Sequence, residues 1–273
     1  MLFFVNGNAA SQRHRAGISL LTEENRLQKK HLGKREKAVT LPDKVVKEKF
    51  MVQRETPMVV AKTEKQKHYL KLLNDPSVQI IVCLGLHGTG KSFLSASVAA
   101  EKFRKNQIKK IIVARAYVQT GKSSGYKPGS SLEKLYPYVR NVLDPIKVKL
   151  GTGAFEVALK DGSTGDIQVQ EIESIRGRSF DEPSFLLIEE AQQTTPDEML
   201  AIVTRIGDEC KLVLSGDLDQ KDVKGESGLK WFLDFAVKHQ LKGVGYVNFD
   251  QPDDIVRGGM ARDIAIGLMR ERK

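Results

Sequence analysis

A glycine-rich segment, residues 85–92, constrains the fold of this chain more than any other part of it. The segment reads Gly-Leu-His-Gly-Thr-Gly-Lys-Ser and matches the phosphate-loop pattern G-x-x-x-x-G-K-[ST]. An apolar run, residues 78–84, precedes it, and a helix-forming run, residues 92–103, follows it. This strand, loop and helix context predicts a nucleotide-binding loop; a glycine-rich turn that only resembles the pattern is the alternative.

The chemistry of such a loop predicts a bound nucleoside triphosphate. Glycines let the backbone fold into a cradle of N–H groups, and the amino terminus of the next helix adds partial positive charge. Lys91 is expected to contact the β- and γ-phosphates, and the Ser92 hydroxyl to bind Mg²⁺. The residues expected to hold the nucleotide are Gly85, Leu86, His87, Gly88, Thr89, Gly90, Lys91, Ser92 and Phe93.

The rest of the chain predicts an α/β fold around this loop. Strand-like and helix-like runs alternate, which indicates a parallel sheet with helices on both faces and ligands at the carboxyl ends of the strands. Further strands are expected near residues 110–114, 184–188, 211–215 and 245–249, and further helices near 63–73, 131–149, from 195, near 228–238 and from 252. Residues 155–172 are ambiguous, because residues 160–163 could turn a hairpin or end a short helix.

Two acidic residues follow the apolar run at 184–188. Nucleotide hydrolases place one carboxylate at this position on the water shell of Mg²⁺ and the next against the attacking water. We interpret Glu189 as the metal-side carboxylate and Glu190 as the catalytic one; simple charges beside a helix are the alternative. After the next strand, Gln220 is spaced to sense a γ-phosphate or orient water, although it and Asp217 could be mere turn formers.

Residues 1–55 differ in composition from residues 56–273, which are expected to form the folded domain. They hold 12 Lys/Arg and 6 Asp/Glu, so they carry +6 of the net charge of +10. Few apolar residues and no sustained period predict a flexible basic arm. Such an arm could contact nucleic acid, or it could be a solvated extension without a role.

Composition also limits the class of protein. Two cysteines, Cys83 and Cys210, are too few for a disulfide framework or a cysteine-based metal site, which fits a reducing cytoplasm. The apolar residues 2–5 are too few for a signal peptide, and no run is long enough to cross a bilayer. We therefore expect a soluble, cytoplasmic protein without a membrane partner.

The order of the motifs resembles the PhoH-like ATPases. The resemblance covers about residues 58–270 and rests, beside the motifs above, on Thr63 with Gln66, Gly125 to Gly129 with Glu133-Lys134 and Pro137-Tyr138, Arg176-Gly177-Arg178, Glu190-Ala191-Gln192, Thr204-Arg205-Ile206-Gly207 and Asp254-Ile255-Val256-Arg257. It implies a single RecA-like P-loop NTPase domain, similar to the first motor domain of superfamily-one helicases. In two places the chain departs from the family's usual residues: Glu189 replaces aspartate and Ala116 replaces proline.

The resemblance implies ATP and Mg²⁺ as cofactors and roles for three further residues. Gln66 would contact adenine, Gln220 the γ-phosphate, and Arg257 would act as an arginine finger, in cis or from a neighbouring subunit. An ion pair with Asp253 or Asp254 is the alternative for Arg257. The family is associated with phosphate starvation and RNA metabolism in bacteria and phages and is thought to form rings, which implies a homo-oligomer such as a hexameric ring.

Two groups of residues are expected to contact nucleic acid. Lys122, Tyr126 and Lys127 combine charge, an aromatic ring and flexible glycines in a loop at the ligand-bearing edge of the sheet. Arg176 and Arg178 flank a glycine and could grip phosphates, or could pair with Glu182 and its neighbours instead. Trp231, on an apolar helix face, is expected in the core.

Together these features predict an ATPase that acts on RNA or single-stranded nucleic acid. The residues after the phosphate loop are too few for a second motor domain, so translocation would need neighbouring subunits. The alternatives are a regulatory module that signals through its ATP state with weak turnover and, less favoured, a small-molecule kinase.

Overall fold

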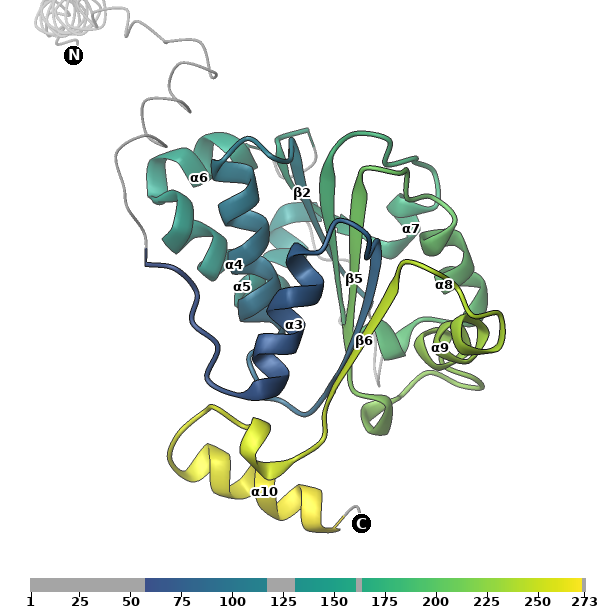
Figure 1. The fold of residues 1–273 in the computed structure, drawn as a ribbon. Helices are drawn as coiled ribbons and strands as arrows, with labels where there is room; N and C mark the ends of the chain where they lie inside the picture. The colour runs from purple at the N-terminus through teal and green to yellow at the C-terminus, as the bar shows by residue number, and fades with distance from the viewer. Residues whose placement is uncertain (1–56, 117–130, 161–163, 272–273) are drawn as a thin grey trace, which may run out of the picture. The chain divides into compact units, whose positions relative to one another are not determined.

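Figure 1 shows the fold in a computed structural model, which describes residues 57–116, 131–160 and 164–271. The predicted basic arm, residues 1–55, lies outside this part of the chain. Within it, six parallel strands form one sheet in the order β3-β2-β4-β5-β1-β6. Their bounds are β1 Ile80–Gly85, β2 Lys110–Arg115, β3 Ile167–Glu171, β4 Ser184–Glu189, β5 Cys210–Gly216 and β6 Val244–Phe249.

Helices lie on both faces of this sheet, as the sequence predicts (Figure 1). One apolar core packs against α3 to α6 and includes Tyr69, Phe103 and Phe155; the other packs against α7 to α9 and includes Met199 and Phe232. The helix bounds are α3 Glu64–Asn74, α4 Lys91–Arg104, α5 Ser131–Leu150, α6 Thr152–Leu159, α7 Ile172–Ile175, α8 Pro196–Val203, α9 Gly228–Lys238 and α10 Met260–Glu271. The α/β, RecA-like fold class is confirmed.

Two helix starts follow directly from their capping residues. The Thr63 hydroxyl accepts a hydrogen bond from the backbone N–H of Gln66 at 3.1 Å and so caps α3. Thr195 and Glu198 form a reciprocal capping box at the start of α8, with Pro196 at the first helical position. Both predicted starts are confirmed.

The strand order brings the predicted chemistry to one edge of the sheet. β5 lies between β4 and β1, with Leu84 opposite Gly216 and Ile188 opposite Leu214. Because all the strands run in parallel, the phosphate loop after β1 and the segments after β4 and β5 share the carboxyl edge. β1 and β4 are almost wholly buried, as expected for strands covered on both faces.

The structure decides one alternative left open by the sequence and corrects one prediction. Of the two possibilities for the ambiguous region, the end of a short helix is the one seen: α6 ends at Leu159, and β3 pairs in parallel with β2 rather than in a hairpin. The helix expected from Pro252 is only a 3₁₀ turn, Pro252–Asp254, followed by extended backbone at Ile255, and α10 begins at Met260. The Asp254 carboxylate closes that turn by accepting the N–H of Gln251 at 2.9 Å, and the chain is then held extended across the phosphate loop.

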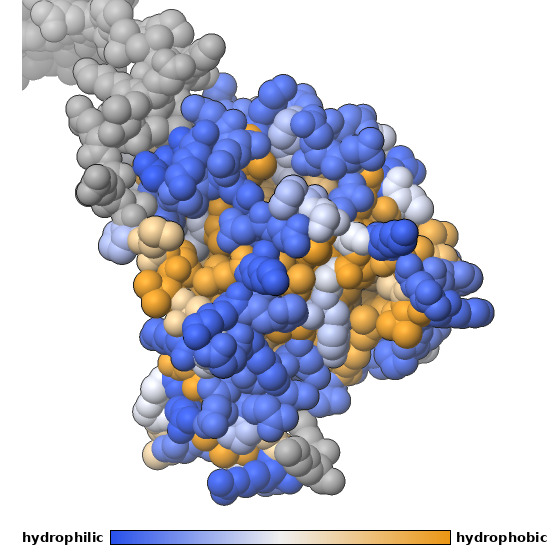
Figure 2. Space-filling view, in the orientation of Figure 1, coloured by the Kyte–Doolittle hydropathy of each residue, from blue (hydrophilic) through white to orange (hydrophobic). Residues whose placement is uncertain are grey.

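The surface matches this arrangement. Hydrophilic side chains cover most of the face seen in Figure 2, and apolar side chains lie in patches between them. Trp231 packs against the second core but is only partly buried, and its ring stacks on the exposed Phe235, so the prediction of a core position is right only in part. None of the helices in the described ranges is both long enough and apolar enough to cross a membrane.

Candidate nucleotide-binding site

The phosphate loop joins β1 to α4 through three glycines with positive φ. Gly85, Gly88 and Gly90 have φ values of 130°, 85° and 87°, which side-chain-bearing residues rarely adopt. At Gly85 a Cβ would also lie 2.4 Å from the carbonyl oxygen of Phe249 in β6. The loop conformation therefore depends on glycine, as expected of a backbone cradle that can receive phosphate at the amino terminus of a helix.

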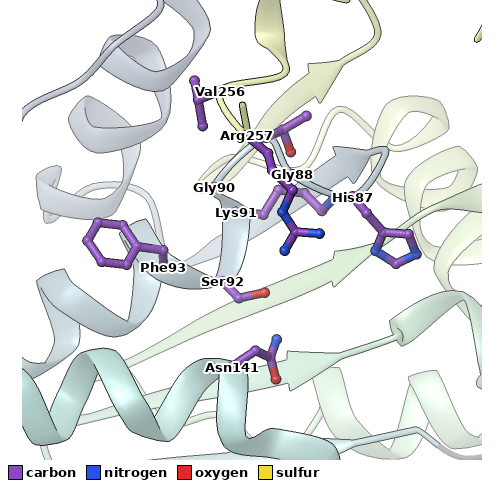
Figure 3. Close-up of a pocket in the computed structure, with 10 residues that line it drawn as sticks. His87, Gly88, Gly90, Lys91, Ser92, Phe93, Asn141, Val256 and Arg257 are labelled. Atoms are coloured by element: carbon purple, nitrogen blue, oxygen red, sulfur yellow. The ribbon is translucent and has the colours of Figure 1, made fainter. Parts of the chain in front are cut away.

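A cavity of about 430 Å³ opens beside this loop (Figure 3), within the usual size range of ligand pockets. It is lined by His87, Gly88, Thr89, Gly90, Lys91, Ser92, Phe93, Asn141, Val256 and Arg257. Seven of these ten residues are among those predicted to hold the nucleotide, and Arg257 is the predicted finger. These seven loop residues and Arg257 thus face one space, whereas the predicted Gly85 and Leu86 do not line it.

Lys91 is bound to the loop itself. Its Nζ donates hydrogen bonds to the carbonyl oxygens of Gly85 at 2.5 Å and Leu86 at 2.9 Å. The Thr89 hydroxyl donates to the same Leu86 carbonyl at 3.0 Å and braces the loop from the other side. The ammonium group is therefore placed within the cradle, where a phosphate oxygen could replace a carbonyl oxygen as its acceptor.

Ser92 and Glu189 form the predicted metal-side pair. The Ser92 hydroxyl donates to Glu189 Oε2 at 2.7 Å, and Asn141 Nδ2 donates to the same oxygen at 3.2 Å. Burial raises the pKa of the Glu189 carboxyl, opposed by these two hydrogen bonds and by the charge of Lys91. Hydroxyl and carboxylate oxygens beside a phosphate cradle are donors that suit Mg²⁺, so the residues present fit a magnesium nucleotide.

Glu190 lies one residue further along, in a strained backbone conformation. Its φ of 52° and ψ of 39° fall in the left-handed region, which is uncommon for a residue with a side chain and often marks functional sites. Gln192 Nε2 donates to its Oε2 at 2.7 Å, and Arg115 Nη2 lies 3.6 Å from its Oε1. These partners hold the carboxylate outside the cavity lining.

A chain of hydrogen bonds links Glu190 to the phosphate loop. Gln192, which bonds Glu190, also accepts from the backbone N–H of Asp217 at 3.2 Å. Gln220 Nε2 donates to Asp217 Oδ2 at 2.5 Å, and Gln220 Oε1 lies 2.8 Å from His87 Nε2. Gln220 therefore contacts the loop through His87 rather than lining the cavity, and the path from Glu190 to His87 is continuous.

Arg257 reaches the cavity from the extended segment before α10. The backbone N–H groups of Val256 and Arg257 both donate to the carbonyl of Gly88, at 3.0 and 3.1 Å. A Cβ on Gly88 would lie 3.0 Å from the Cβ of Arg257, so the segment packs directly on the loop. In Figure 3 the guanidinium points toward Lys91 and Ser92. The chain thus brings Arg257 to its own phosphate loop.

The segment that carries Arg257, residues 250–257, forms ion pairs in which Arg257 takes no part. Lys65 pairs with Asp250 and, at 2.9 Å, with Asp254, which ties the segment to α3. Asp253 lies 3.9 Å from Arg262. Among the described residues, neither aspartate pairs with Arg257, so the alternative expected from the sequence is not the arrangement seen.

Gln66 contacts the phosphate loop from α3. Its Nε2 donates to the carbonyl of Thr89 at 2.9 Å, and its Oε1 accepts the N–H of Lys62 at 2.7 Å. The side chain is buried and does not line the cavity. Gln66 thus contacts the loop at Thr89, and its contact with adenine stays a prediction.

The residues predicted to contact nucleic acid divide into two groups. Lys122, Tyr126 and Lys127 lie outside the described residues. Arg176 pairs with Glu198 at 3.3 Å, whereas Arg178 donates to Gln168 at 2.8 Å and lies over the Phe180 ring. Glu182, the partner considered for these arginines, lies 3.3 Å from Lys110 instead.

Two residues of the cavity lining, Asn141 and Val256, are not among those that the sequence predicts to hold the nucleotide. Asn141 lies within α5, between Pro137 and Pro145, and no phosphate-loop motif includes it. Val256 reaches the cavity only because the chain after Asp254 is extended rather than helical.

Comparison with known proteins places this site in a family. A family model described as PhoH-like protein matches residues 58–267. Protein PhoH of Escherichia coli K12 is 33% identical over 211 residues, which cover 77% of this chain and 58% of that protein. The PhoH-like protein of Bacillus subtilis is 34% identical over 200 residues, which cover 72% of this chain and 59% of that protein. The PhoH-like protein of Synechocystis is 29% identical over 209 residues, which cover 76% of this chain and 61% of that protein. The chain thus spans about three-fifths of the length of these relatives.

Proposed function

We propose that this chain, which belongs to the PhoH-like family, binds ATP with Mg²⁺ and hydrolyses the terminal phosphoanhydride bond. Family membership indicates a P-loop protein of the ATPase type, and the hydrolysis step is our proposal. The observation that carries it is that Lys91, Ser92 and Arg257 line one cavity, with Glu189 hydrogen-bonded to Ser92. Such a set can bind a triphosphate and stabilise the charge that develops during its cleavage.

Binding begins with the phosphate loop. Its backbone N–H groups and the amino terminus of α4 would receive the phosphate oxygens, and Lys91 would exchange the Gly85 and Leu86 carbonyls for them. A bound Mg²⁺ would neutralise charge on the β- and γ-phosphate oxygens. Ser92 would hold it directly and Glu189 through water, the roles for which their oxygens are placed.

Hydrolysis requires that Glu190 face a water molecule beside the γ-phosphate. In this structure Gln192 and Arg115 hold its carboxylate, so it must turn inward as the nucleotide binds. The path through Gln192, Asp217 and Gln220 to His87 gives the loop a means of influencing that turn. Glu190 would then accept the proton of the attacking water, while Arg257 stabilises the phosphoryl oxygens.

The contacts of Glu190 with Gln192 and Arg115 favour a second candidate function. If Glu190 stays with Gln192 and Arg115 after ATP binds, turnover is slow and the protein acts as a regulatory module that signals through its nucleotide state. Steady-state phosphate release at saturating ATP separates the two functions. Hydrolysis well above that of a Lys91→Ala control supports the ATPase, and ATP binding without hydrolysis supports the module.

RNA or single-stranded nucleic acid is the proposed partner of the ATPase. A net charge of +10 and the basic composition of residues 1–55 support a polyanion partner. Adding a single-stranded RNA to the phosphate-release assay should stimulate turnover, more strongly at low salt. Turnover that is unchanged by RNA or single-stranded DNA over a range of salt would contradict this coupling.

Self-association is the proposed assembly, as a homo-oligomer such as a hexameric ring. Light scattering after size-exclusion chromatography, with and without ATP, gives its mass directly. A monomer under both conditions at micromolar concentration would contradict the proposal.

A further inference from the structure

Asn141 lines the cavity but belongs to none of the sequence motifs and has no family-derived role. It comes from α5, on the side of the cavity opposite the segment that carries Arg257, and its amide faces Ser92 (Figure 3). Its Nδ2 donates to Glu189 Oε2 at 3.2 Å. Asn141 is itself exposed, so this contact is not explained by a need to satisfy a buried amide.

The contact constrains the orientation of the Glu189 carboxylate. A glutamate side chain has three rotatable bonds, and one hydrogen bond from Ser92 leaves the carboxylate free to rotate about it. The second donor comes from a different helix, so Oε2 is fixed between α4 and α5. The described residues give no hydrogen bond to Oε1, which leaves that oxygen as the acceptor for a metal-bound water.

We propose that Asn141 is a positioning residue for the metal side of the site: it holds Glu189 so that Oε1 can accept from the water shell of Mg²⁺. This rests on the proposed function, because it presumes a magnesium nucleotide in the cavity. Partners that orient a metal-associated carboxylate in this way typically contribute 10- to 100-fold to metal affinity.

The contact also depends on the length of the carboxylate at position 189. An aspartate would withdraw its oxygens by one methylene, about 1.5 Å, and a hydrogen bond of 3.2 Å from α5 would then be out of range. Asn141 and Glu189 should therefore act as a pair whose two substitutions are not additive.

The test measures the affinity for a fluorescent, non-hydrolysable ATP analogue in excess EDTA and in saturating Mg²⁺, and takes the ratio of the two dissociation constants as the magnesium gain. Asn141→Ala should leave the dissociation constant in EDTA within about twofold of that of the unsubstituted protein. It should lower the magnesium gain by about tenfold or more. Arg140→Ala is the matched control, because Arg140 is the neighbouring exposed residue of α5 and pairs with Asp144 away from the cavity. It should change neither value.

The double substitution completes the test. In a Glu189→Asp background, Asn141→Ala should lower the magnesium gain by less than about twofold further, because the contact is already lost. An unchanged magnesium gain in Asn141→Ala, an equal weakening in EDTA and in Mg²⁺, or full additivity with Glu189→Asp would each overturn the proposal. Failure of the unsubstituted protein to bind the analogue under either condition would instead refute the proposed function, and the positioning role with it.

Discussion

Truncating Arg257 to alanine should remove catalysis while sparing ATP binding and folding. The segment is anchored by backbone N–H groups, at 3.0 and 3.1 Å from the Gly88 carbonyl, and by the Lys65 ion pairs, none of which uses the guanidinium. Arg257 is exposed, so its truncation should change the free energy of unfolding by no more than about 0.5 kcal/mol. The loss should therefore fall on the reaction.

The size of that loss follows from the role of the side chain. An arginine that stabilises charge on the transferring phosphoryl group contributes roughly a thousandfold or more to kcat. A thousandfold corresponds to about 4 kcal/mol of transition-state stabilisation, with little effect on the ground state. Arg257→Ala should therefore show an ATP dissociation constant within a few-fold of the unsubstituted protein and a kcat reduced by about three orders of magnitude.

The assay pairs steady-state phosphate release with equilibrium binding of a fluorescent ATP analogue. Arg270→Ala, which removes an exposed arginine from α10, is the control and should behave as the unsubstituted protein. Because Arg257 lies against its own phosphate loop, mixing Arg257→Ala with Lys91→Ala protein should restore no activity. Normal turnover by Arg257→Ala at saturating ATP would refute the finger role, and recovery on mixing would refute its action in cis.

Two further substitutions test the surroundings of the loop. Gln66→Ala should weaken ATP binding more than tripolyphosphate binding, because only ATP carries the base that Gln66 is predicted to contact; equal weakening in competition assays would leave Gln66 as a clamp on the Thr89 carbonyl alone. Glu189→Gln should raise the melting temperature of the nucleotide-free protein at pH 7 to 8, because burial raises the pKa of the Glu189 carboxyl and ionisation therefore opposes folding. A carboxyl whose pKa is raised on folding destabilises the folded protein only when the pH is high enough to ionise it. The difference in melting temperature between Glu189→Gln and the unsubstituted protein should therefore shrink toward pH 4. A difference in melting temperature that stays constant over this pH range would contradict the raised pKa.

The sequence predicts the fold well because its signals are local and repeated. The apolar runs behind β1, β2, β4, β5 and β6 need no knowledge of distant contacts, and burial on both faces explains why they do not alternate. Thr63 and Thr195 likewise mark helix starts by their own side chains. The phosphate loop is recognisable for the same reason, since its glycines and Lys91 form one short segment.

Prediction fails where distant segments decide local structure. Asp253 and Asp254 after Pro252 are typical of the first turn of a helix, but the Gly88 carbonyl accepts the backbone N–H groups of Val256 and Arg257 and holds the chain extended. The same hydrogen bonds bring Val256 and Arg257 to the cavity. Asn141 could not be found for a related reason, because its role depends on α5 packing beside α4 so that Asn141 reaches Glu189 at the end of β4, which no local pattern encodes.

The contacts of the Glu190 carboxylate also could not be predicted from the sequence. Its position after β4 predicts a catalytic base, yet its contacts with Gln192 and Arg115 appear only when the strands are assembled. Those contacts make its release the step that separates an ATPase from a slow nucleotide-binding module.

Phosphate release from ATP by the unsubstituted protein, compared with Glu190→Gln and Lys91→Ala, tests the central claim most directly. The proposed function predicts steady hydrolysis by the unsubstituted protein, ATP binding with at least a hundredfold slower hydrolysis by Glu190→Gln, and neither tight binding nor hydrolysis by Lys91→Ala. Release by the unsubstituted protein no faster than by Lys91→Ala, or undiminished release by Glu190→Gln, would contradict it.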